Sequence, residues 1–223
     1  MARTSEALDA FLYFKKNKAG DTVAIEGETT DLALVPSSKG SAGSGKDDGA
    51  SAGIDRKEAI AGSPIELQSY QLGLSIEALW PYQLKKAKAA AGKSGNANWL
   101  PKPKLNNFTF SKAVDSGTPG LFQALCTNAT YDEVCLIQRR AGGTIAAAGH
   151  VFLKITFGQV VVTNMDWTTG GAEAPPLETV QLSYRSMKIE YWPQKHTGGR
   201  ENAAKSAEFA LPDGSSDGGE DGV

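Results

Sequence analysis

The sequence of 223 residues contains very little cysteine and histidine. Cys126 and Cys135 are not spaced as a CxxC motif, so we expect two reduced, partly buried thiols, with a regulatory disulfide as the alternative. His150 and His196 have no cysteine or acidic cluster at ligand spacing near them. We therefore expect no metal site and no cofactor.

The sequence also lacks a long apolar run and a strong excess of either charge. No stretch approaches the roughly 18 apolar residues of a membrane helix, and the formal net charge is −2. Glu6 and Asp9 near the N-terminus are not typical of a secretory signal. We expect synthesis in the cytoplasm, no direct membrane insertion and no nucleic-acid partner.

Three segments have too few apolar residues to form a core. Residues 36–63 consist mostly of Ser, Gly, Ala and balanced charges, which predicts a flexible insertion. Residues 81–104 contain six lysines and no acidic residue; we expect a Lys-rich insertion with one helical possibility at Gln83–Ala91. Residues 195–223 contain six acidic and three basic residues and are predicted to be a disordered acidic tail.

The rest of the sequence is dominated by short β patterns. The alternation changes phase near Gln68–Ser69 and at Arg185–Ser186, which predicts bends where one strand serves two surfaces. Strands at short intervals predict a mainly β protein, an antiparallel two-sheet β-barrel with one short flanking α-helix. The predicted strands are Leu8–Lys15, Thr22–Glu26, Ile65–Ile76, Phe108–Ser111, Tyr131–Arg139, Val151–Val162 and Glu178–Trp192.

One convincing helix is predicted, over Ser116–Thr127. Thr118 can cap it and Pro119 fits its first turn. Its apolar stripe consists of Leu121, Phe122, Leu125 and Cys126.

Residues 40–47 read GSAGSGKD, one residue short of the phosphate-binding pattern GxxxxGK[ST]. Asp47 stands where the pattern needs a hydroxyl, and Asp48 adds a second negative charge. Gly49 and Gly53 disfavour the helix that must follow, by about 1 kcal/mol each relative to Ala. We interpret the segment as a solvated linker, and we expect no enzymatic activity.

The lysines of residues 81–104, together with Trp99, have the composition of a nucleic-acid site. A solvated basic loop fits the acidic chain better. A third interpretation is that this loop contacts the acidic tail or an acidic surface on an adjacent copy, a contact that salt above about 0.5 M should weaken.

Other charged residues give weaker signals. Arg139 and Arg140 end a strand, and a solvated strand edge is favoured over an anion site. Glu173, Glu178 and Glu190 do not have the spacing of an acid–base pair.

Four segments together resemble the Hcp family, the hemolysin-coregulated proteins of type VI secretion systems. They are residues 25–31 (IEGETTD), 65–70 (IELQSY) followed by Gly73, 108–122 (FTFSKAVDSGTPGLF) and 184–194 (YRSMKIEYWPQ). The resemblance covers about residues 7–194 and implies an Hcp-like β-barrel domain over residues 1–194. The two insertions and the tail depart from the family pattern.

The resemblance implies a structural protein that assembles with itself. Hexameric rings would stack into a hollow tube that carries effectors, with a spike protein at its tip and a contractile sheath around it. The protein would be cytoplasmic before firing and then secreted or delivered into a target cell. The alternatives are the tube protein of a related phage-tail-like injection particle and a lumen-type, effector-binding chaperone.

The same resemblance gives candidate residues for the family motif and for assembly, and none for catalysis. They are Gly27, Glu28, Thr30, Asp31, Leu32, Leu34, Phe110, Lys112, Asp115, Pro119, Leu121 and Phe122.

Overall fold

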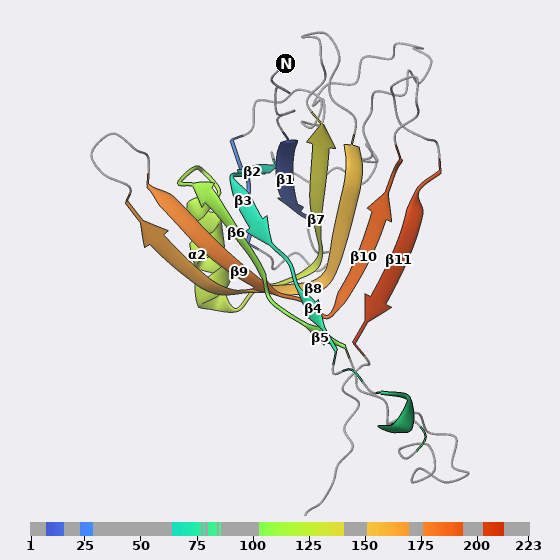
Figure 1. The fold of residues 1–223 in the computed structure, drawn as a ribbon. Helices are drawn as coiled ribbons and strands as arrows, with labels where there is room; N and C mark the ends of the chain where they lie inside the picture. Colours follow the sequence, from blue (N-terminus) through green and yellow to red (C-terminus); the bar gives the residue numbers. More distant parts are fainter. Residues whose placement is uncertain are drawn as a thin grey trace, which may run out of the picture.

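The computed structural model describes residues 8–15, 23–28, 64–76, 78, 80–83, 85, 103–140, 151–169, 176–193 and 203–211 (Figure 1). Its elements are β1 (Leu8–Phe14), β2 (Ile65–Leu67), β3 (Ser69–Gln71), β4 (Leu74–Ser75), β5 (Lys104–Leu105), β6 (Phe108–Ala113), α2 (Thr118–Thr127), β7 (Thr130–Arg140), β8 (Val151–Thr168), β9 (Leu177–Ser183), β10 (Ser186–Tyr191) and β11 (Lys205–Ala210). The predicted fold class, mainly β and antiparallel with one flanking helix, is confirmed.

The main sheet curls back on itself. Its hydrogen-bonded order is β2-β1-β7-β8-β9-β6-β3, and the two end strands, β2 and β3, are separated in sequence by Gln68 alone. The backbone N–H of Gln68 donates to the carbonyl oxygen of Ser111 on β6, at 2.9 Å. One short segment therefore leaves β1 and joins β6 at the predicted phase change, as a bend in the strand allows.

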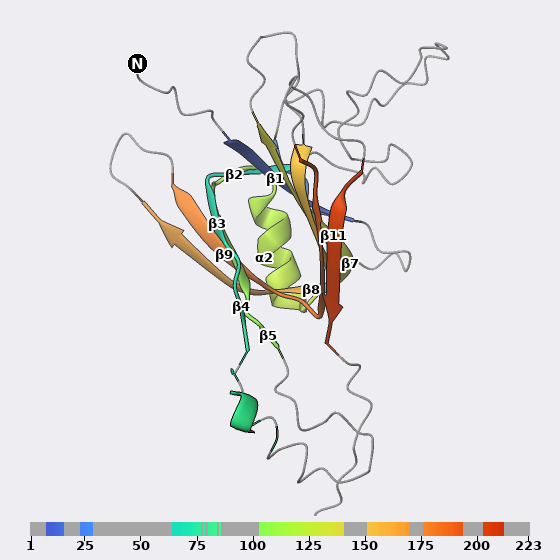
Figure 2. The same ribbon diagram turned by 45° about the vertical axis from the view of Figure 1, so that its right-hand side comes forward.

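Strand β8 serves two surfaces because it bends in its middle. Its first half pairs with β7 and β10, and its second half pairs with β9 (Figure 2). Gln159 has a φ of 51° at the bend, a left-handed conformation that is uncommon outside glycine. The backbone N–H of Arg185 donates to Gly158 O at 3.0 Å. The phase change predicted at Arg185–Ser186 therefore lies beside the bend of β8.

The core fills the concave side of the curled sheet with aromatic and aliphatic side chains. The ring of Phe157 lies 4.9 Å from that of Phe108 and 4.8 Å from that of Tyr184, between centroids. Phe108 and Phe110 are fully buried because every second residue of β6 faces inward. Each such side chain contributes about 1.5–3 kcal/mol through burial.

The helix differs from its prediction in two ways. It begins at Thr118, and the preceding Gly117 makes no side-chain capping hydrogen bond, so the predicted cap at Thr118 is wrong. The helix buries Leu121 and Ala124, whereas Phe122 is exposed. Cys126 is exposed as well, so the predicted apolar stripe is only partly correct. The helix packs against β8 on one side, and Gly120 in its first turn lies against Ala24 and Ile25.

Two predictions on extended segments are also corrected. The part of Thr22–Glu26 that the structure describes is not a strand; this segment runs against α2 instead. The tail predicted to be disordered contains β11, which pairs with β10 over its whole length, Met187 opposite Phe209. Backbone pairing with an open strand edge, together with the half-buried Phe209, orders a segment whose average composition is polar.

Several sequence predictions lie outside the described residues. They include the GSAGSGKD segment, His150, His196, Trp99 and Glu173. Most of the Lys-rich insertion lies outside as well, although residues 81–83 are helical and Lys85 and Lys104 are exposed. In the part of the chain that the structure describes, no helix has the length and hydropathy to cross a membrane.

The two cysteines are free thiols in different environments. Cys126 is exposed and Cys135 is buried, so the prediction of two partly buried thiols is wrong for Cys126. Burial raises the pKa of the Cys135 thiol to about 11, although hydrogen bonds from Tyr13 and Thr156 act in the opposite direction.

We predict that the native protein reacts with one equivalent of a thiol reagent at pH 8. With a pKa of about 11, only about one thousandth of Cys135 is thiolate at that pH, and the thiolate is the reactive form. Two equivalents should react in urea, and Cys126→Ser should reduce the native count to zero. Rapid reaction of both native thiols would contradict the burial of Cys135.

Candidate functional site at the start of helix α2

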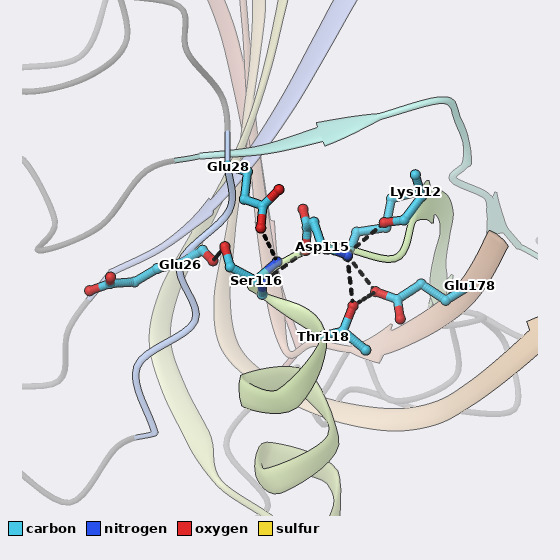
Figure 3. Close-up of polar contacts among 9 residues, drawn as sticks. Glu26, Glu28, Lys112, Asp115, Ser116, Thr118 and Glu178 are labelled. Carbon is cyan, nitrogen blue, oxygen red and sulfur yellow. Dashed lines mark hydrogen bonds and ion pairs between the residues drawn. The ribbon is translucent and has the colours of Figure 1, made fainter. Parts of the chain in front are cut away.

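Three of the sequence-predicted residues, Glu28, Lys112 and Asp115, lie in or beside a buried ion-pair cluster where β6 leads into α2 (Figure 3). Lys112 of β6 lies directly opposite Glu178 of β9 in the sheet register. Both side chains are 0% exposed, and Lys112 Nζ lies 2.6 Å from Glu178 Oε1. An opposite-charge pair at facing positions stabilises this strand pairing. It also disfavours a one-residue slip, which would turn one of the two charges to the other face and leave its partner buried alone.

The ammonium group of Lys112 also organises the turn after β6. It donates to Asp115 Oδ1 at 2.5 Å and to the Ala113 carbonyl oxygen at 3.0 Å. The Thr118 hydroxyl lies 3.3 Å from Lys112 Nζ and donates to Glu178 Oε1 at 3.0 Å. Asp115 Oδ1 accepts the Gly117 N–H as well, at 2.8 Å. One cation thus joins β6, β9 and the first residue of α2.

The chain before the first insertion is fastened to the same turn. Glu28 Oε1 accepts the backbone N–H of Ser116 at 2.9 Å, and the Ser116 hydroxyl donates to Glu26 O at 2.9 Å (Figure 3). A carboxylate that accepts a backbone N–H just before a helix is also favourably placed for the helix dipole.

Two glycines permit this close approach. A Cβ atom on Gly120 would lie 2.6 Å from Ala24 O, and one on Gly27 would meet the Pro64 carbonyl oxygen and lie 2.7 Å from Ile65 Cα. Real Cβ atoms essentially never come so close to backbone atoms. The glycines in the IEGETTD and TPGLF motifs are therefore explained by backbone packing.

The buried ion-pair cluster is suited to stabilising the fold and not to binding a substrate. Lys112 and Glu178 are inaccessible to solvent, and their polar contacts are with one another, with Asp115 and with Thr118. Glu178 Oε2 is buried and has no hydrogen-bond partner among the described residues. A substrate could not reach them without opening the fold. Among the described residues, no group of three or more His, Cys, Asp or Glu side chains is placed to hold a metal ion.

The structure brings together only some of the candidate residues. Glu28, Lys112 and Asp115 meet in the cluster, and Gly27 lies beside it. Phe110 and Leu121 are core residues, whereas Pro119 and Phe122 are exposed. Thr30, Asp31, Leu32 and Leu34 lie outside the described residues.

Sequence reasoning missed Glu178 and misjudged Arg139. The spacing of Glu178 from other acids gives no functional signal, but Glu178 shares the inward-facing alternation of Val180 and Leu182. Arg139 does not lie at a solvated strand edge: its side chain is 7% exposed and its Nη2 lies 3.2 Å from Asp9 Oδ2. Its guanidinium lies 5.3 Å from the centroid of the Phe11 ring, at a distance typical of cation–π contact.

Fold and cluster define a structural class, a curled antiparallel β-barrel in which helix α2 is tied to the wall by a buried ion pair. The family described as "Type VI secretion system effector, Hcp" matches residues 57–191, more than half of the chain. The chain therefore belongs to the Hcp family of type VI secretion proteins.

Individual relatives agree with this assignment. The chain is 29% identical over 100 residues to Protein hcp1 of Pseudomonas aeruginosa, a match that spans 45% of this chain and 60% of that protein. A solved "type six secretion system protein" has a TM-score of 0.60 at 18% identity, covering 92% of this chain and 96% of its own. Hcp1 from Salmonella typhimurium has a TM-score of 0.51 at 20% identity, covering 92% and 95%. At such identities the structural likeness supports the fold alone.

We predict that Lys112→Met lowers the free energy of unfolding by about 3–5 kcal/mol, because it leaves a buried carboxylate unpaired. Urea unfolding of the full chain measures the loss. Lys188→Met is the control: that lysine is 42% exposed and lies 3.1 Å from Glu190, so about 0–1 kcal/mol is expected. If Lys112→Met does not fold, Thr118→Val should still show a loss of about 1–3 kcal/mol. Equal, small losses in all three variants would contradict the role of the cluster.

We predict that Gly27→Ala destabilises the fold by about 1–3 kcal/mol, because the added methyl group meets backbone atoms that cannot turn away. Gly73→Ala is the matched control. There the new Cβ would lie 2.8 Å from Asn106 Nδ2, the end of a side chain that can rotate. Thermal unfolding that is unchanged by Gly27→Ala would show that the 23–28 segment does not pack as described.

Proposed function

We propose that this chain is a tube subunit that closes into hexameric rings, and that the rings stack into a hollow tube carrying effectors. Family membership carries the proposal, because the match over residues 57–191 includes α2 and the strands β2 to β10. The spike protein, the contractile sheath and the effectors are proposed partners on the same basis. The proposed location is cytoplasmic before firing and extracellular or inside a target cell afterwards.

The distribution of exposed apolar side chains supports ring formation. A closed ring needs heterologous contact, in which one patch of a subunit meets a different patch of its neighbour. Phe122 on α2 and Trp167 near the end of β8 are 51% and 50% exposed, and their ring centroids lie 6.4 Å apart. We call this pair the helix patch, and we propose it as one side of the contact between neighbours in a ring.

The buried cluster supports the proposal in a different way. It fixes the first residue of α2 against β9, and β9 pairs directly with the end of β8 that carries Trp167. The two halves of the helix patch are therefore held in fixed relation. Thr30, Asp31, Leu32 and Leu34 remain proposed assembly residues on the family resemblance alone.

The purified full chain should have six times the subunit mass by light scattering and form closed rings in negative-stain electron microscopy. A uniform monomer at micromolar concentration and low salt would contradict the proposal. Stable one-to-one binding of a small effector by such a monomer would favour the chaperone alternative.

We predict that Phe122→Ser with Trp167→Ser weakens the ring at least about tenfold at each contact, since large aromatic side chains dominate interface energies. Light scattering across a dilution series measures the effect. Trp80→Ser is the control, because Trp80 is 65% exposed and lies on a different part of the molecule. Unchanged rings in the Phe122/Trp167 variant would remove the helix patch from the interface.

A further inference from the structure

Two parts of the chain with opposite charge leave the barrel at the same end. The first is the arm, residues 72–76, 80–83, 85 and 103–107, in which β4 and β5 pair only with each other in the described part of the chain. It leads into β6, whose first residue Phe108 lies opposite Leu182. The second part follows β11, where the N–H of Leu211 donates to Arg185 O at 2.8 Å. Both are therefore anchored within residues 182–185, and in Figures 1 and 2 strand β11 ends at the end of the barrel from which β4 and β5 extend.

The arm is cationic and unusually apolar for a projecting element. Its exposed apolar side chains are Leu74, Ile76, Trp80 and Tyr82, which are 47%, 58%, 65% and 69% exposed. The N–H of Trp80 donates to Gln83 Oε1 at 2.8 Å, which steadies the helical turn that carries Tyr82. Lys85 and Lys104 are exposed as well, and residues 81–104 contain six lysines and no acidic residue. An apolar group of this kind marks an interaction surface.

Residues 212–223, which we call the acidic segment, carry the opposite charge. They contain no basic residue, and their acidic residues are Asp213, Asp217, Glu220 and Asp221. With so few apolar side chains the segment cannot pack a core of its own, so charge is what it offers a partner. Its 12 residues span at most about 40 Å when fully extended, and they begin beside the base of the arm.

Several other lysines of the chain already have a carboxylate partner. Lys15, Lys112 and Lys188 lie 2.7, 2.6 and 3.1 Å from carboxylate oxygens. No ion pair joins Lys85 or Lys104 to another residue that the structure describes. Because the acidic segment is tethered beside these two lysines, its effective concentration there is roughly millimolar. Free polyanions must compete with that concentration.

We propose that the acidic segment folds back on the arm of its own chain and holds its carboxylates against the arm lysines. The contact shields the arm from other polyanions. Lysines beside aromatic side chains can bind phosphates and stack on bases, so an uncovered arm would retain nucleic acid in spite of the net charge of −2. Ring formation is not required, because both parts belong to one chain.

The first experiment joins lysines to carboxylates with a zero-length carbodiimide. Unlabelled and isotope-labelled full-length protein are mixed in urea and refolded together, so that any assembly contains both forms, and mass spectrometry identifies the cross-linked peptides. Between residues 81–104 and the acidic segment, we expect at least about tenfold more cross-links within one label than between labels in 50 mM NaCl, and at least about tenfold fewer in total in 0.5 M NaCl, where the charges are screened. Lys205 is the reference, because it is exposed at the far end of β11, opposite Tyr191. It should link to the acidic segment less often than Lys104.

The second experiment uses the native full chain and a fluorescent single-stranded oligonucleotide. One variant neutralises the acidic segment through Asp213→Asn, Asp217→Asn, Glu220→Gln and Asp221→Asn. It should bind the oligonucleotide at least about tenfold more tightly than the wild type in 50 mM NaCl, because the arm lysines become available to phosphates. Adding Lys85→Gln and Lys104→Gln should remove most of that gain.

The matched control changes the net charge by the same amount at exposed carboxylates elsewhere. It carries Glu26→Gln, Glu66→Gln, Asp166→Asn and Glu208→Gln. This variant should bind the oligonucleotide like the wild type. A gain equal to that of the neutralised acidic segment would attribute the effect to net charge and overturn the contact.

The remaining outcomes are equally decisive. Cross-links that join different labels as often as one label would assign the arm to a second copy and overturn the fold-back contact, as would an acidic segment that links to no lysine of residues 81–104. If the urea-treated protein does not refold, the oligonucleotide series still decides: equal affinity of the neutralised variant and the wild type would overturn the shielding. Neither readout requires a ring, so the absence of rings would overturn the proposed function and leave the fold-back contact standing.

Discussion

The buried pair of Lys112 and Glu178 is the interaction on which the arrangement of β6, β9 and α2 depends. Burying two charges costs several kcal/mol per ion, and their attraction offsets this only when the remaining hydrogen bonds are satisfied. Here Asp115 accepts from Lys112 and Thr118 donates to Glu178 Oε1, whereas Glu178 Oε2 is buried without a hydrogen-bond partner among the described residues. The same contacts fix strand register, helix start and turn together, which apolar packing alone would not specify so narrowly.

The strands could be predicted because burial of one face gives a period of two, and both phase changes mark real bends. The cluster was harder because its partners are distant in sequence. A signal was present: alternation from Phe108 and Phe110 places Lys112 on the buried face, and Val180 does the same for Glu178. An inward-facing lysine predicts a buried acid, but only the topology identifies which one.

Strand β11 and Arg139 illustrate the other limit of sequence reasoning. β11 is stabilised by an edge that β10 offers, and Arg139 is buried by β1 beside it. The local sequence of neither one predicts this outcome, because each depends on a neighbouring strand from a remote part of the chain. Local composition therefore predicts how such a segment behaves in isolation, but it does not predict the structure that the segment adopts beside its neighbouring strand.

The barrel is a curled sheet that is closed by one short segment of the chain. Segment 65–71 joins β1 through three residue pairs and β6 through three more, whereas β1 and β7 share seven pairs. Segment 65–71 is therefore held to each of its neighbouring strands by fewer residue pairs than β1 is to β7. We expect the amide protons of β2 and β3 to exchange with solvent faster than those of β7. The barrel would then open locally along segment 65–71 before the whole subunit unfolds.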